Sequence, residues 1–202
     1  MAVSEMKVFN HTKIPDELLK PILYRSAKAV GSIRTQKVVI KITTSQYSYS
    51  GHVKPCRIMA YRLWYLEGRY SDKPSKQIML RSDGGYMFLR IPVNRFTQDP
   101  IAFAENVFNL ASHEWQHIKD LQKNNRFGEY NRNWRNRPHE RRAITAAKRA
   151  DRVKDKNEFI QDSILNLALF MEDVWKEKKA EWDKKVEEAK ERARKRLEES
   201  VK

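Results

Sequence analysis

Cysteine, glycine and proline are scarce in this sequence. Its 202 residues include one cysteine, Cys56, together with 6 glycines and 7 prolines. A single cysteine excludes an intramolecular disulfide and favours a reducing compartment, so we expect the protein to be cytoplasmic. Neither a Gly/Ser-rich nor a Pro-rich stretch marks a linker, and no internal repeat is found.

Long apolar runs are also absent. The longest, such as residues 164–171, fall far short of the roughly 20 residues that a membrane-spanning helix needs. Residues 1–8 contain no basic stretch followed by an apolar one, so no secretory signal is recognised there. We therefore expect no membrane partner. Because hydrophobic residues still make up 40% of the chain, it can bury the core of one ordinary domain.

Acidic residues are fewer than basic ones, 26 against 41, which gives a net charge of +15. The excess is uneven: from residue 172 onward 11 basic residues nearly balance 10 acidic ones, whereas residues 119–154 hold 12 basic and 4 acidic residues. A basic region of this kind attracts polyanions by counterion release, so nucleic acid is one expected partner of residues 119–154. A generally basic protein without such a partner explains the same composition, and the alternative stays open.

The elements predicted from periodicity and capping signals are one helix, then strands, then helices, which indicates an α+β fold. Strands are expected over residues 37–44, 57–66, 77–81 and 86–93, and helices over residues 15–30, 100–123, 138–154 and 157–200. The last two strands flank Gly84 and Gly85, which is typical of a hairpin. Asp99 is expected to cap the second helix, and Pro21 is expected to disturb the first.

Residues 113–117 have the sequence His-Glu-x-x-His inside the second expected helix. Residues four apart on a helix share a face, so His113 and His117 can bind one metal ion, and zinc prefers such nitrogen ligands. Glu114 is placed to take a proton from a water molecule that the metal acidifies. The motif thus predicts one zinc ion per chain, with Glu114 as the general base. The alternative is a surface helix that carries two unrelated histidines.

A catalytic zinc site normally has a third protein ligand. The candidates are His139 and Glu140, at the start of the helix that Pro138 opens. Neighbouring residues on a helix point about 100° apart, so only one of the two can coordinate the metal. We favour Glu140 and keep His139 as the alternative. A first-turn glutamate that only interacts with the helix dipole is a further interpretation.

The motif at 113–117, followed by Glu-x-x-Ala from Glu140 to Ala143, resembles the gluzincin branch of the zincin metallopeptidases. The small size is similar to that of minimal gluzincins, including small viral or microbial zinc metallopeptidases. The resemblance implies a zincin-like fold with an N-terminal helix, a small twisted mixed sheet, two zinc-bearing helices and here a long C-terminal helix. It implies Glu140 as the third ligand. Ile144 departs from the family, which often has an aspartate there that orients a histidine, and Asp120 is the candidate to replace it.

We divide the chain into a zincin-like metallopeptidase domain, residues 1–155, and a C-terminal helical extension, residues 156–202. The extension has a thin apolar stripe, which fits either a solvated helix or one docked on the domain, where it could cover the cleft as a latency segment. Residues 86–93 are the candidate edge strand along which a peptide would bind. Residues 124–137 interleave aromatic residues with arginines, which suits single-stranded nucleic acid.

Together these patterns predict a zinc-dependent endopeptidase that hydrolyses peptide or protein substrates, in which Glu114 passes the proton of water to the leaving amine. The alternatives are a basic, nucleic-acid-associated binding protein on a zincin scaffold, or a protease that acts on DNA-bound proteins as SprT-like proteases do. The transition state needs an oxyanion donor. The candidates near in sequence are Tyr130, Arg135, Arg137 and His139. The oligomeric state is not indicated.

Overall fold

The computed structural model describes residues 5–31, 37–46, 48–55, 84–96, 99–122 and 138–200. These residues form four helices and a small mixed four-stranded sheet, which confirms the α+β class. The strands expected over residues 57–66 and 77–81 and the basic stretch 124–137 lie outside the described residues. Within the described ranges, no helix combines the length and apolar character needed to cross a membrane.

The sheet has the strand order β1-β2-β4-β3. Its strands are β1 (Glu5–Asn10), β2 (Lys37–Thr44), β3 (Ser50–Pro55) and β4 (Gly84–Ile91). β2 pairs in parallel with β1 and β4, whereas β3 runs antiparallel to β4. The expectation that residues 86–93 form the edge is therefore wrong, because β4 is bonded on both sides and β3 lies at the edge of the described sheet.

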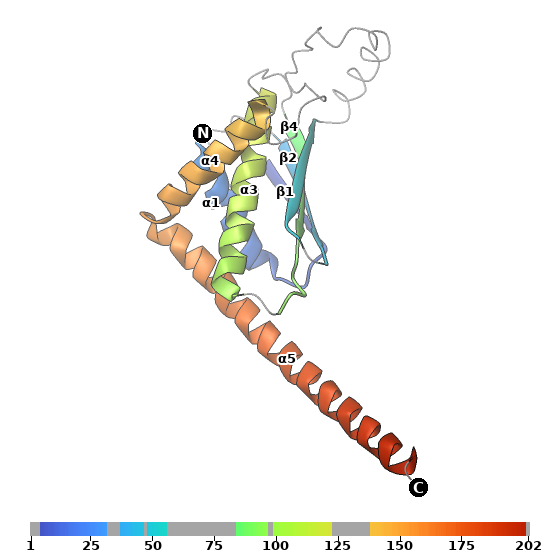
Figure 1. Ribbon diagram of the computed structural model, residues 1–202. Coiled ribbons are helices and arrows are strands. Elements are labelled where there is room, and N and C mark those ends of the chain that lie inside the picture. Colours follow the sequence, from blue (N-terminus) through green and yellow to red (C-terminus); the bar gives the residue numbers. More distant parts are fainter. Residues whose placement is uncertain are drawn as a thin grey trace, which may run out of the picture.

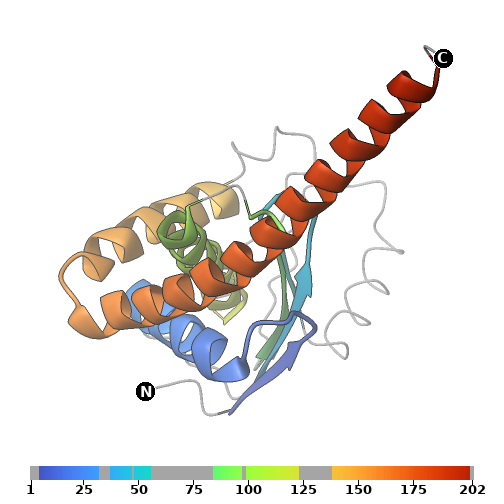
Figure 2. The same cartoon turned by 90° about the horizontal axis from the view of Figure 1, so that it is seen from below.

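The helices lie on one side of the sheet (Figures 1 and 2). They are α1 (Asp16–Val30), α3 (Pro100–Gln122), α4 (Pro138–Lys154) and α5 (Glu158–Ser200). These bounds agree with the expected helices to within one or two residues, and Pro21 is accommodated inside α1. α3 is the central helix, since it packs on β3 and β4 and also on α1, α4 and α5.

One continuous hydrophobic core joins the inner face of the sheet to the helices. The alternating residues of β2 and β4 that face the helices are all buried: Val38, Ile40, Ile42, Met87, Leu89 and Ile91. Trp115 of α3 is fully buried, and its Nε1 donates a hydrogen bond to the Leu23 carbonyl of α1 at 2.9 Å. A buried indole N–H needs such a partner, so this bond sets how α3 is rotated against α1.

The first half of α5 belongs to this core. Its buried side chains run from Ile160 to Trp175, and Trp175 Nε1 donates to the Val93 carbonyl at 2.7 Å. The packed unit therefore extends past the boundary expected at residue 155. A ring contact between Trp182 and Phe96 follows, and beyond it α5 projects away from the rest of the molecule (Figure 1).

Candidate metal centre

Helix α3 begins where the sequence predicts and presents the motif residues to one side. The backbone N–H of Ile101 donates to Asp99 Oδ1 at 2.9 Å, so Asp99 caps this helix as expected. Within the motif, Trp115 points into the core against α1. Because neighbouring helical positions differ by about 100°, His113 and His117 then face α4 instead.

The imidazoles of His113 and His117 meet with their Nε2 atoms 3.2 Å apart and their rings nearly perpendicular, at 81°. Oε2 of Glu140 lies 3.2 Å from His113 Nε2 and 3.6 Å from His117 Nε2. Three potential ligand atoms from two helices thus form a nearly equilateral triangle. Ligand atoms of His113, Glu114 and His117 also lie within 4.8 Å of one another.

Glu140 reaches this triangle because α4 lies close against α3. Ala143, fully buried, occupies the next turn of α4, where a larger side chain would separate the two helices. Asp120, also fully buried, accepts hydrogen bonds from Arg142 Nε at 2.9 Å and Gln116 Nε2 at 2.7 Å. The role predicted for Asp120, orienting a histidine, remains a prediction. The bond from Arg142 joins α4 to α3, and the bond from Gln116 lies within α3.

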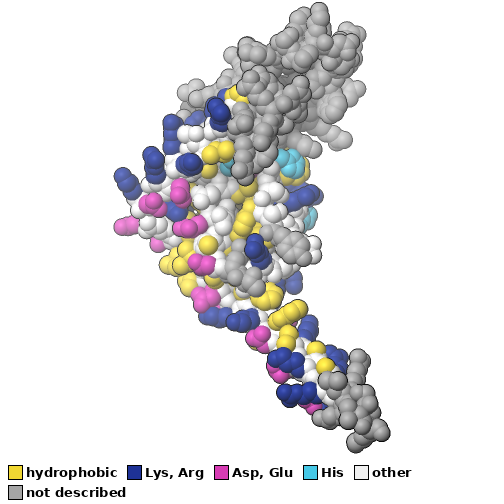
Figure 3. All heavy atoms as spheres, viewed as in Figure 1, with side chains coloured by type: hydrophobic (Ala, Val, Ile, Leu, Met, Phe, Trp, Pro, Cys, Tyr) yellow, Lys and Arg dark blue, Asp and Glu magenta, His cyan; other side chains and the backbone are white. Residues whose placement is uncertain are grey.

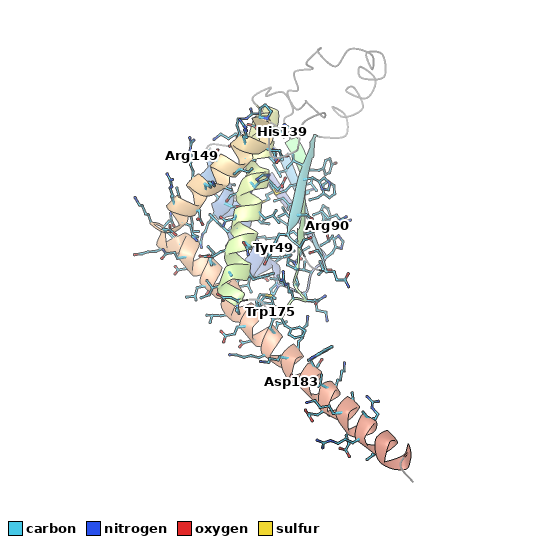
Figure 4. The ribbon with its side chains drawn as sticks, viewed as in Figure 1. Tyr49, Arg90, His139, Arg149, Trp175 and Asp183 are labelled. Carbon is cyan, nitrogen blue, oxygen red and sulfur yellow. The ribbon has the colours of Figure 1, made fainter. Side chains whose placement is uncertain are left out.

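His139 lies in the same site but in a different place from Glu140. Its Nε2 is 3.4 Å from Glu140 Oε1, the carboxylate oxygen that does not face the other two histidines. Figure 4 shows His139 at the start of α4, close to α3. The structure therefore brings both candidate third ligands to the site and places Glu140 between the histidines. Of the candidate oxyanion donors, only His139 is among the described residues.

The carboxylates of Glu114 and Glu140 have opposite environments. Glu114 is only 2% exposed, and burial, with a smaller contribution from the negative charge of Glu140, raises its pKa to about 8. Burial also acts to raise the pKa of Glu140, but hydrogen bonds with His113, His117 and His139 outweigh it and hold that pKa well below its usual range. Burial lowers the pKa of His117, which favours the neutral imidazole that binds metals.

The site opens into a cleft of about 770 Å³ between β3 on one side and α3 and α4 on the other. Sequence reasoning missed the β3 wall, including Gly51. It also missed Asn109 and Asn106 of α3, which lie one and two turns before the motif, respectively. A single glycine among β-branched or aromatic residues often marks a place where another group approaches the strand backbone closely. Gly51, between Tyr49 and Val53, carries this signal in the sequence. No α5 residue among those described lines the cleft, so α5 does not cover it in this conformation.

No protein-family model matches the chain, and neither a curated protein nor a solved structure matches it.

Proposed function

We propose that this protein is a zinc-dependent metallopeptidase whose metal is held by His113, His117 and Glu140. The observation that carries the proposal is the triangle of two imidazole nitrogens and one carboxylate oxygen, with sides of 3.2, 3.2 and 3.6 Å. Tetrahedral zinc with bonds of ~2.0–2.1 Å separates its ligand atoms by about 3.3 Å, so these residues fit the ion. Two histidines and one glutamate also match a known catalytic zinc donor set, which leaves a coordination position open.

Zinc bound there would acidify a water molecule and polarise the scissile carbonyl. Glu114 is buried beside the histidines and faces the cleft. A metal cation beside Glu114 would favour its ionised form. The carboxylate then accepts the proton of the attacking water and delivers it to the leaving amine nitrogen, so one residue serves both half-reactions. The second oxygen of Glu140 is held by His139, which keeps the carboxylate oriented between His113 and His117.

The cleft suits an extended polypeptide. β3 forms one wall and lies at the edge of the described sheet, where backbone N–H and C=O groups can pair with an added strand. Main-chain pairing with β3 would hold a substrate along the cleft and carry its scissile bond past Glu114. Peptide or protein is therefore the substrate class that we assign.

The first test is zinc content by elemental analysis, on protein purified without added metal. We expect about one zinc per chain in the wild type and none in the His113→Ala/His117→Ala double variant. His11→Ala is the control, because His11 is an exposed histidine directly after β1 and does not line the cleft. The next test is hydrolysis of an unfolded protein substrate, which Glu114→Gln should abolish while zinc is retained.

The two measurements separate the parts of the proposal. Absence of zinc from the wild type, even after reconstitution, would remove the metal site and the enzyme together. Zinc without any hydrolysis, across a broad set of unfolded proteins and peptides, would leave a metal-binding protein and overturn the peptidase assignment.

A further inference from the structure

A second hollow lies on the opposite side of α3 and α4 from the cleft. It has a volume of about 420 Å³ and is formed by the C-terminal end of α1 together with α3 and α4. It shares no described lining residue with the cleft. We call it the rear pocket; its charged lining residues are Lys119, Asp120, Arg141, Arg142 and Arg149.

Positive charge in the rear pocket exceeds what the described residues neutralise. Asp120 is the one acidic side chain of the described lining, and its carboxylate pairs with Arg142. Even so, Arg142 Nη2 is buried without a hydrogen-bond acceptor in the described part of the chain. Arg141 and Arg149 form no ion pair with any described residue. Two guanidinium groups and part of a third therefore remain available to an anion.

The placement of these groups is regular. Arg141, Thr145 and Arg149 are spaced by four residues, so they line one stripe of α4. Figure 4 shows Arg149 extending from the outer side of α4, away from the sheet, and Figure 3 shows Lys and Arg side chains gathered along this helix. Both arginines are exposed and can turn toward the pocket. Ala29, Val30 and Ala146 give the pocket an apolar patch, and Gln116 also lines it.

Lys119 shapes the pocket from α3. Its Nζ donates to the carbonyl of Val30 at 2.9 Å, at the last residue of α1. The following residue, Gly31, has φ of 96°, and a Cβ atom there would approach Lys119 Nζ to 3.1 Å. The glycine thus lets the chain leave α1 while the ammonium group stays at the pocket wall.

We propose that the rear pocket binds a phosphate ester. Guanidinium groups present paired N–H donors that match phosphate oxygens, and a cluster of them suits a group that carries up to two negative charges. The phosphate is held by Arg141 and Arg149 with the free Nη2 of Arg142, and its organic part rests on Ala29, Val30 and Ala146. The ester is either a free nucleotide or one phosphodiester of a single-stranded nucleic acid. This site is independent of the peptidase activity, since it lies behind the metal-bearing helices.

The test is a binding titration of the full chain at constant ionic strength with three probes: a labelled single-stranded oligonucleotide, a mononucleotide and inorganic phosphate. The pocket variant is Arg141→Ala/Arg149→Ala. The matched control is Arg192→Ala/Arg194→Ala, which removes the same charge from the projecting part of α5. We expect the pocket variant to bind the preferred ester at least tenfold more weakly, and the control to change by less than about twofold. Arg141→Lys/Arg149→Lys, which keeps the charge but loses the paired donors, should fall between them.

The outcomes are distinct. Pocket-dependent binding of the oligonucleotide alone identifies a nucleic-acid strand as the source, and comparable binding of the mononucleotide identifies a free nucleotide. Equal weakening in the pocket and control variants would mean attraction to net charge only and would overturn the proposal. Saturable binding of inorganic phosphate alone, or of no probe, would overturn it as well. A circular dichroism spectrum and a thermal melt like those of the wild type show that the pocket variant is folded.

Discussion

Gly51 of β3 lies directly against the carboxylate of Glu114. A Cβ atom at position 51 would be 2.5 Å from Glu114 Oε1 and 2.7 Å from its Cδ and Cγ. Carbon atoms in proteins do not approach so closely, and Glu114 is a buried side chain with little room to move. The backbone of the edge strand is therefore the wall that holds Glu114 in place, and only glycine leaves space for it.

We expect Gly51→Ala to displace the Glu114 carboxylate and to lower kcat on the order of 100-fold, because a shift of about 1 Å in a catalytic group costs that much. Zinc content should stay at the wild-type value, since the three atoms nearest to the new methyl group all belong to Glu114. Val53→Ala, on the same face of β3, is the control for a change in the cleft wall that leaves Glu114 in place. Full activity in Gly51→Ala would show that Glu114 does not work from this position.

Zinc is expected to raise the melting temperature of the metal-free protein, because an ion that binds only the folded state stabilises it by mass action. Glu140→Gln should remove most of this increase, since it removes one of three ligands. His139→Gln should weaken zinc binding about 10- to 100-fold, as expected of a residue that holds a ligand without binding the metal. Differential scanning fluorimetry with a zinc titration measures all three. If His139→Gln lost more zinc affinity than Glu140→Gln, His139 would be the third ligand and Glu140 would not.

The buried Glu114 should make the metal-free protein less stable as the pH rises. The folded-state pKa of Glu114 is raised from 4.5 to about 8. The stability that protonated Glu114 contributes is therefore fully present below about pH 4.5, and it is lost as the pH rises through about 8. Between about pH 5 and pH 8 the contribution falls by up to roughly 3 kcal/mol, since each pKa unit corresponds to ~1.4 kcal/mol. Glu114→Gln should lack this dependence.

The measurement is urea denaturation in the presence of a chelator at several pH values, comparing wild type with Glu114→Gln. Titration of the groups that do not interact with Glu114 cancels in this difference. Glu181→Gln, an exposed glutamate on α5, should keep the wild-type pH dependence. If the free energy of unfolding depended on pH in the same way for wild type and Glu114→Gln, a raised pKa at Glu114 would be contradicted.

The two halves of α5 should differ in their importance. Truncation after residue 184 removes only the projecting part and should leave stability and zinc content unchanged. Truncation after residue 173 removes Trp175, which packs edge-on against Phe103 at 5.3 Å, and should destabilise the fold by about 3–5 kcal/mol. Thermal melts of the three chains decide this. A gain of activity in the chain that ends at residue 173, but not in the chain that ends at residue 184, would support the latency segment.

The helices and the motif could be read from local signals. Asp99 and Pro100 start α3, and Gly31 ends α1, because capping chemistry depends on neighbours within a few residues. The strands were harder. β1 and β3 were missed. SGHVKP shows no alternation of apolar and polar residues, and EMKVFN alternates over only its first four residues. Residues 86–93 open with four consecutive apolar or aromatic residues, YMFL. Such a run shows that a strand is largely buried, but it did not decide between an interior strand and an edge.

The sequence by itself determined the fold class and the set of residues that can hold a metal, because helix period and ligand chemistry are local properties. Only the tertiary structure decided that Glu140 comes between His113 and His117, while His139 binds its other oxygen. It also placed Gly51 against Glu114, and it placed three arginines of α4 along a pocket behind the metal site. The physical reason is the same in each case: these relationships are distances between elements far apart in the chain, and the packing of α3 against α1, α4 and the sheet sets them.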